Sequence, residues 1–214
     1  MVLSSDTVRA RLDAARLYAI TPDAPSGDVE ALVGAWLRGG ADMIQLRSKA
    51  LARGELLALA RRLAPACAEA QVLFIVNDHL DIAMLSGADG VHLGEEDLSL
   101  RSARHVAGSD LLIGASASSP DAGRAAREAG ADYLGAGAAY ATPIKAHKPP
   151  IGPGGVRCVQ EAVDVPVFAI GGIDRARVPE LRAAGVHRVC VIRALAEADD
   201  PESEARLLRE ALSL

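Results

Sequence analysis

Short apolar runs alternate with amphipathic stretches along almost the whole chain. The amphipathic stretches are rich in Ala, Leu and Arg, and the one at 56–63 places leucines on one face and arginines on the other, as a helix does. A short helix is expected before the first strand. The apolar runs predict eight strands, at 17–20, 43–46, 73–76, 90–93, 111–115, 133–137, 167–170 and 188–192. Short strands that alternate with helices are typical of a parallel sheet covered by helices.

A recurring glycine motif separates helix-like stretches from the strands that follow them. Each glycine stands where a helix C-cap is expected, just before an apolar run. The motif occurs as Gly40-Ala41-Asp42, Gly87-Ala88-Asp89, Gly130-Ala131-Asp132 and, more weakly, Gly185-Val186-His187. The spacings of 47, 43 and 55 residues (87−40, 130−87, 185−130) each leave room for two strands and two helices. Residues 1–214 are therefore predicted to form one α/β domain, a (β/α)₈ TIM barrel, with a doubly wound open sheet as the alternative.

Composition narrows the class of partner. Half of the 214 residues are apolar, which disfavours disorder, and the net charge of −5 argues against a nucleic-acid or anionic-membrane surface. Cys67, Cys158 and Cys190 form no Cys-x-x-Cys pair, which favours a reducing compartment. The start of the sequence has no basic segment followed by an apolar core, and no later apolar run approaches membrane-spanning length, so we expect neither a signal segment nor a membrane span. We expect a cytoplasmic protein with small-molecule partners, and the sequence leaves a homodimer open.

Two aspartates follow neighbouring predicted strands. Asp78 comes after strand 73–76 and Asp97 after strand 90–93, so both carboxylates should reach the rim where barrel enzymes place their sites. Magnesium keeps several waters and is commonly shared between one or two carboxylates and substrate phosphates. Either aspartate alone could instead cap the helix that follows it. The two together favour one magnesium ion.

Positive charges and glycines on the same rim favour a phosphorylated ligand. The three cations are Arg47, Lys49 and Lys145. They could simply be solvated surface residues, as most lysines and arginines are. A diphosphate ester, however, carries roughly three negative charges near neutral pH, which three cations would balance. Gly171-Gly172 lies after the seventh strand, where barrels commonly bind phosphate; a tight turn capped by Asp174 is the alternative.

Other features of the sequence also bear on catalysis. The proline-rich segment 141–155 follows the sixth strand and is a candidate lid. His92 alternates within an apolar strand and is expected in the core. No Ser/His/Asp or Cys/His nucleophile set can be assembled from these spacings. Displacement of diphosphate assisted by a metal and by cations fits the pattern better.

Five motifs resemble those of the thiamine phosphate synthase family, over nearly the whole chain from residue 17 to residue 195. They are Gln45-Leu46-Arg47-Ser48-Lys49, Asn77-Asp78-His79-Leu80-Asp81, 89–97 (DGVHLGEED), Gly114-Ala115-Ser116 and Ala169-Ile170-Gly171-Gly172-Ile173. The resemblance implies a transferase that joins hydroxymethylpyrimidine diphosphate to a thiazole ethyl phosphate, giving thiamine monophosphate and diphosphate. It also implies that the pyrimidine substrate loses diphosphate first, so that negative charge builds on the leaving group.

The resemblance assigns roles to residues at matching positions. It implies that Asp78 and Asp97 hold Mg²⁺ and that Gln45 binds the pyrimidine. The diphosphate would be bound by Arg47, Lys49, Asn77, Ser116 and Lys145, of which Arg47, Lys49, Ser116 and Lys145 are the expected catalytic residues. The thiazole phosphate would be bound by Thr142, Ile144, Gly172, Ile192 and Arg193.

The chain departs from the family pattern at two positions. Ile144 stands where a second threonine is common, and Arg193 stands where a serine is common. Both lie in the half of the site that would bind the thiazole phosphate. The sequence therefore does not determine which thiazole phosphate is the preferred substrate. Rival functions are a thiazole tautomerase on the same barrel and a non-catalytic barrel that binds a thiamine precursor. Retention of both aspartates and of the cations argues against each rival.

Overall fold

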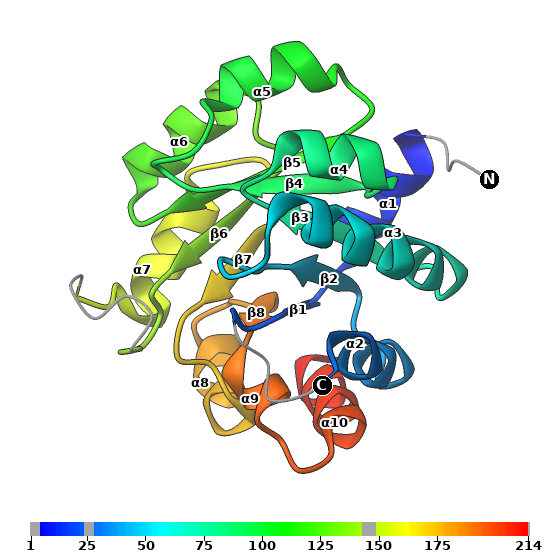
Figure 1. Ribbon diagram of the computed structural model, residues 1–214. Coiled ribbons are helices and arrows are strands. Elements are labelled where there is room, and N and C mark those ends of the chain that lie inside the picture. The colour runs from blue at the N-terminus through cyan, green and yellow to red at the C-terminus, as the bar shows by residue number, and fades with distance from the viewer. Residues whose placement is uncertain (1–4, 24–27, 143–148, 214) are drawn as a thin grey trace.

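The computed structural model describes residues 5–23, 28–142 and 149–213. Its eight parallel strands close into a barrel in chain order, and β1 pairs with β8 to complete the ring (Figure 1). The strands are β1 (Leu17–Ile20), β2 (Met43–Leu46), β3 (Leu73–Asn77), β4 (Gly90–Leu93), β5 (Leu112–Ala117), β6 (Tyr133–Gly137), β7 (Val167–Ile170) and β8 (Val189–Val191). The predicted TIM barrel is confirmed, and the open-sheet alternative is wrong.

Five strands, β1, β2, β4, β6 and β7, have the predicted bounds. The other three differ at their ends. β3 includes Asn77, and β5 runs on to Ala117, so Ser116 lies within a strand rather than after it. β8 is shorter than predicted because Arg188 and Ile192 lie outside the ladder.

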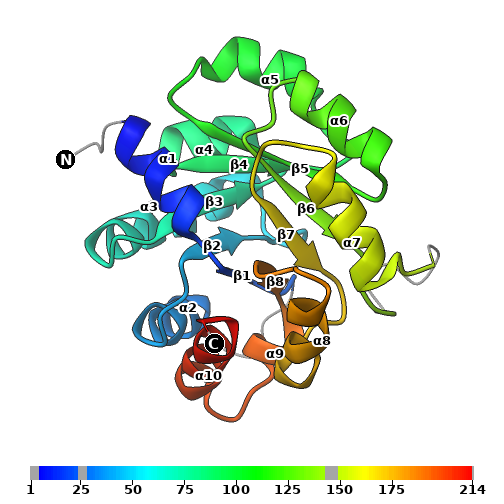
Figure 2. The same cartoon turned by 180° about the vertical axis from the view of Figure 1, so that it is seen from behind.

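Helices surround the barrel on all sides (Figures 1 and 2). They are α1 (Ser5–Ala14), α2 (Val29–Arg38), α3 (Arg53–Glu69), α4 (Leu80–Ser86), α5 (Leu100–Ala107), α6 (Pro120–Glu128), α7 (Gly152–Glu161), the 3₁₀ turn η2 (Arg175–Arg177), α8 (Val178–Ala183), α9 (Arg193–Ala196) and α10 (Pro201–Ser213). The end of the proline-rich segment is helical, since α7 begins at Gly152; Pro153 fits its first turn because proline needs no amide partner there. None of the described helices has the length and apolar character needed to cross a membrane.

The repeated glycine motif has the predicted backbone role. Gly40, Gly87, Gly130 and Gly185 all have positive φ, at 85°, 77°, 105° and 79°. Residues with a Cβ rarely adopt this backbone conformation. Glycine therefore ends each helix and lets the chain turn into the next strand. The motif thus sets the entry of β2, β4, β6 and β8 into the barrel.

Two apolar clusters hold the fold together. The larger fills the space between the barrel and its helices, and Trp36, Leu46 and Leu134 belong to it. The smaller fills the barrel interior with Tyr18, Tyr133 and Phe168, whose rings meet edge to face. Val8 and Leu12 of α1 join this inner cluster, so α1 covers the end where the strands begin. The opposite, carboxyl-terminal rim is left for the candidate site.

Candidate active site

Asp78 and Asp97 meet at the carboxyl ends of β3 and β4. The parallel register pairs Asn77 with His92, and the Asp78 amide continues it by donating to the His92 carbonyl oxygen at 2.9 Å. Asp97 folds back on the loop after β4, where its Oδ2 accepts a hydrogen bond from the Gly94 amide at 2.7 Å. The two carboxyl groups are close enough to share a hydrogen bond.

Neither aspartate caps the helix that follows it. α4 begins after His79, and α5 is capped by Ser99, whose hydroxyl accepts from the Ser102 amide at 3.2 Å. The capping alternative is therefore wrong for both. Asp78 also has a left-handed backbone, with φ of 63°. Strained conformations of this kind concentrate at functional sites, where the rest of the fold holds them in place.

The electrostatics of the pair indicate a site for a cation. Partial burial raises the pKa of Asp78 to about 6; the hydrogen bond and negative charge of Asp97 add to the rise, while Lys49 and Arg47 oppose it. Within the described residues, no group of three or more His, Cys, Asp or Glu side chains could hold a metal ion. A two-carboxylate donor set fits an ion such as magnesium, which would complete its shell with water and phosphate oxygens.

Arg47 is held by partners that the sequence did not reveal. Its guanidinium forms an ion pair with Asp23 at 2.7 Å, and only 16% of its side chain is exposed. The buried Thr21 hydroxyl donates to the Arg47 carbonyl oxygen at 2.9 Å and accepts from the Arg47 amide at 2.8 Å. These contacts join the loops after β1 and β2. The positive charge of Arg47 is thus already balanced by Asp23, whereas Lys49 is exposed.

Gln45 ends a hydrogen-bonded chain inside the barrel. The side chain is buried, and its Nε2 donates to the Tyr18 hydroxyl at 2.5 Å. That hydroxyl lies 2.9 Å from the hydroxyl of Tyr133 on the far side of the barrel. The amide is therefore fixed by strands β1 and β6 as well as by its own strand.

Ser116 on β5 is linked to His92 on β4. The Ser116 Oγ lies 3.2 Å from His92 Nε2, and the imidazole ring also packs against Tyr133, with centroids 5.7 Å apart. His92 is half-buried within the barrel rather than on the surface, and it orients the serine. The predicted site residues on β2 to β5 are thus brought to one side of the rim.

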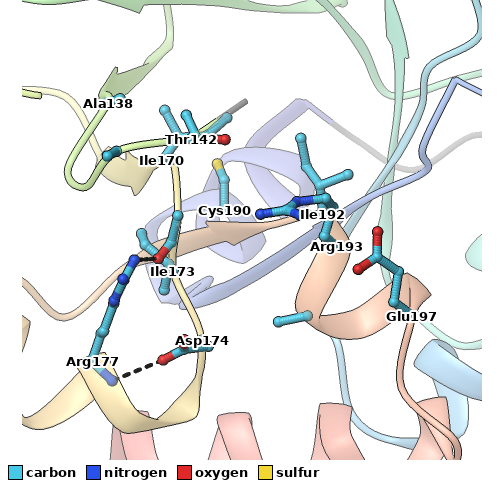
Figure 3. Close-up of a pocket in the computed structure, with 14 residues that line it drawn as sticks. Ala138, Thr142, Ile170, Ile173, Asp174, Arg177, Cys190, Ile192, Arg193 and Glu197 are labelled. Atoms are coloured by element: carbon cyan, nitrogen blue, oxygen red, sulfur yellow. Dashed lines mark hydrogen bonds between the residues drawn. The ribbon is translucent and has the colours of Figure 1, made fainter. Parts of the chain in front are cut away.

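A cavity of about 320 Å³ lies on the other side of the rim, after β6, β7 and β8. Four residues predicted from the sequence line it: Thr142, Ile192 and Arg193, which Figure 3 labels, and Gly172. Gly171 and Gly172 have φ of 102° and 64°, which only glycine adopts readily. Asp174 caps η2, because its carboxylate accepts a hydrogen bond from the Arg177 amide at 3.1 Å. The turn capped by Asp174, which the sequence offered as the alternative to phosphate binding, is therefore present.

Arg177 is a cavity residue that the sequence analysis missed. Its guanidinium hydrogen-bonds to the Gly172 carbonyl oxygen and stacks on the Tyr140 ring at 4.4 Å from the centroid. The Tyr140 hydroxyl in turn donates to Glu180 at 2.9 Å. No motif marked Arg177, because its position in the cavity depends on η2, a turn of three residues. Ile144 and Lys145, which the sequence also placed in the site, lie outside the described residues.

Comparisons with known proteins give a consistent result. A family model described as thiamine monophosphate synthase matches residues 17–195. The chain is 45% identical to a thiamine-phosphate synthase of Chlorobium luteolum over 173 residues, covering 80% of this chain and 82% of that protein. It is similar to the structure of a thiamine phosphate pyrophosphorylase from Pyrococcus furiosus, with 35% identity, a TM-score of 0.87, and coverage of 96% and 98% of the two chains.

Several relatives are much longer than this chain. A thiamine-phosphate synthase of Gloeobacter violaceus is 45% identical over 194 residues, which cover 91% of this chain and 56% of that protein. The matches to two further relatives cover 40% and 59% of their lengths. The chain thus spans about half the length of these curated relatives.

Proposed function

Because the chain belongs to the thiamine monophosphate synthase family, we propose that it catalyses the reaction named by that family. It joins 4-amino-5-hydroxymethyl-2-methylpyrimidine diphosphate to a thiazole ethyl phosphate. The bond between the pyrimidine methylene carbon and the diphosphate oxygen breaks, and the thiazole nitrogen forms the new bond to that carbon. The products are thiamine monophosphate and diphosphate, which carries away the electron pair of the broken bond.

The adjacent carboxylates of Asp78 and Asp97 are the observation that carries this proposal. They would hold magnesium, which when bound offsets the negative charge that develops on the leaving diphosphate. Two adjacent carboxylates, of which Asp78 has a raised pKa, with Lys49 and Arg47 nearby, suit an ion shared with a diphosphate. The tautomerase rival and the non-catalytic rival need no such pair.

The remaining residues of this half bind and orient the diphosphate. Lys49 and Asn77 contribute donors from the loop after β2 and the end of β3, and Ser116 donates its hydroxyl from β5. Arg47 exchanges Asp23 for a diphosphate oxygen; the 43% exposure of the Asp23 side chain lets that carboxylate turn to water. Gln45, held by Tyr18, orients the pyrimidine.

The cavity after β6 to β8 receives the thiazole phosphate. The left-handed turn at Gly171 and Gly172 permits close approach of a phosphate to the backbone, and Arg193 supplies a guanidinium. Thr142 and Ile192 also line this cavity and would contact the thiazole ring. The assignment of Ile144 and Lys145 to this site rests on the sequence alone.

A diphosphate-release assay tests the proposal. The purified protein is incubated with both substrates and magnesium, and diphosphate and thiamine monophosphate are measured together. Equal amounts of the two products are expected, and both should disappear when magnesium is chelated. Release of diphosphate that does not exceed a protein-free control would overturn the enzyme assignment.

The cellular setting belongs to the same proposal. The described residues contain three free cysteines, of which Cys67 and Cys190 are buried and Cys158 is exposed. Thiols of this kind persist in a reducing compartment, which supports the cytoplasm as the place of the reaction. The substrates are small molecules, and the acidic charge of the chain disfavours a nucleic-acid partner.

A further inference from the structure

A second cavity lies at the opposite end of the barrel, where the strands begin. Its volume is about 390 Å³, and the lining comes from the ends of α1, α8 and α10 and from the residues just before β1 and β8. Among the described residues that line it, three are arginines, Arg16, Arg182 and Arg188, and Asp13 is the single acidic residue. With His187 neutral, three guanidinium groups and one carboxylate leave a formal charge of +2 in a protein whose net charge is −5.

The three arginines lack the acidic partners that other arginines of this chain have. Arg16 donates to the Leu212 carbonyl oxygen at 3.0 Å, and Arg188 donates to the Asp13 carbonyl oxygen at 2.8 Å. Arg104, also at this end of the barrel, forms an ion pair with Asp132. Among residues 5–23, 28–142 and 149–213, no carboxylate lies within ion-pair distance of Arg16, Arg182 or Arg188.

Two donors of the cavity are buried without a partner. The Nε atoms of Arg182 and Arg188 are inaccessible to solvent and have no hydrogen-bond acceptor within the described part of the chain. Burial and the neighbouring Arg16 charge also lower the pKa of Arg188, while Asp13 opposes this. Adjacent like charges and buried N–H groups without an acceptor both destabilise a fold. An anion in the cavity would offset the like charges, and it would give the two Nε–H groups an acceptor once these side chains turn toward it.

We propose that this cavity binds a small phosphate-bearing anion. A guanidinium group presents parallel N–H donors that match two oxygens of a phosphate, and a phosphate dianion equals the charge of the lining. The site is separate from the proposed catalytic rim, which lies at the other end of the strands, and it does not depend on the proposed reaction. Its ligand class is inorganic phosphate, diphosphate or a phosphate monoester.

Site-resolved titration of the wild-type protein with inorganic phosphate tests the inference directly. The Nε–H signals of Arg182 and Arg188 in a nitrogen–proton correlation spectrum should shift together and saturate, at ionic strength held constant with chloride. The Nε–H signal of Arg124, an exposed arginine paired with Asp121, is the matched control and should not move. Signals of Arg182 and Arg188 that stay in place up to saturating phosphate would overturn the proposal.

Variants separate this site from phosphate binding at the catalytic rim. In Arg182→Gln the affinity of one calorimetric phosphate site should fall about tenfold or more, while Arg124→Gln should leave every site unchanged. Arg182→Lys keeps the positive charge but loses the paired N–H donors of the guanidinium. Its phosphate affinity should lie between those of the wild type and Arg182→Gln. Turnover of Arg182→Gln should stay within about twofold of wild type, since this cavity lies at the opposite end of the barrel from the proposed catalytic rim. Unchanged phosphate affinity in Arg182→Gln would contradict the assignment.

Discussion

The two halves of the carboxyl-terminal rim are built by different means. After β2 to β5 the candidate ligands are polar side chains that already contact one another, as Asp78 does with Asp97 and Arg47 with Asp23. After β6 to β8 the site is a cavity shaped by the backbone, where Gly171 and Gly172 adopt left-handed conformations. The first half depends on a balance of charges, and the second depends on backbone shape.

This difference predicts how each half should fail. Removing one charge from the first half should abolish chemistry with little effect on the fold, because its side chains are partly exposed and their partners remain. Adding one methyl group to the second half should disturb the fold and the fit of a ligand together, because a left-handed glycine has no room for it. Four substitutions test the comparison, from the largest expected effect to the smallest.

Asp78→Ala should cause the largest loss of activity. Removing one carboxylate weakens the proposed magnesium site and leaves the charge of the departing diphosphate uncompensated, so kcat/KM should fall by about 100-fold or more. Diphosphate release measured across a magnesium titration checks this. The matched control is Asp81→Ala, which removes an exposed aspartate paired with Arg53 and should retain turnover. A rate near wild type for Asp78→Ala at low magnesium would contradict the assignment.

Gly171→Ala should affect stability and substrate binding together. A Cβ at this position, where φ is 102°, would lie 2.7 Å from the Cβ of Ala138. The strain should lower the free energy of unfolding by about 1–3 kcal/mol and raise KM for the thiazole phosphate, with magnesium affinity unchanged. Urea unfolding and steady-state kinetics measure these effects. Gly54→Ala in α3, where a Cβ would meet nothing within 4 Å, should cause no loss. Equal stability of the two variants would mean that the turn at Gly171 tolerates a side chain.

Arg193→Ser replaces the guanidinium in the cavity by the hydroxyl that the family pattern favours. If Arg193 binds the thiazole phosphate, the substitution removes one charge-assisted hydrogen bond. KM for that substrate should then rise by about 10-fold. The KM for the pyrimidine diphosphate should not change, because that substrate lies in the other half. A KM change of equal size for both substrates would show that the two halves are not independent.

Asp78→Asn should have the smallest effect, and it concerns the protein without magnesium. The pKa of Asp78 is raised to about 6 in the folded state, above its value of about 3.9 in an unfolded chain. The folded state therefore binds the proton more tightly, and the ionised carboxylate makes stability fall as the pH rises from about 4 through about 6. Asparagine removes that loss and suits a left-handed backbone, so the variant should be more stable at neutral pH by on the order of 1 kcal/mol, after allowing for partial exposure. Thermal melts at pH 4 and pH 7.5 should show the gain only at pH 7.5; a gain of equal size at both values would exclude the carboxylate charge as its cause.

Local sequence determined most of the fold and half of the rim. The bounds of β1, β2, β4, β6 and β7 follow from short apolar runs, and Gly40, Gly87, Gly130 and Gly185 adopt the left-handed turns that their motif predicts. These features depend on neighbours within a few residues, so the sequence carries them directly. The meeting of Asp78 and Asp97 could be predicted as well, because parallel neighbouring strands end at one edge.

Only the tertiary structure decided which side chains become partners across the barrel. Asp23 pairs with Arg47, Tyr18 and Tyr133 fix Gln45, and Arg177 reaches the cavity from η2. The phosphate site proposed at the other end likewise gathers Arg16, Arg182 and Arg188 from segments far apart in the chain. Such contacts arise when the barrel closes and brings distant loop ends together at distances that no local pattern encodes. These contacts can therefore be identified only from the closed eight-stranded barrel.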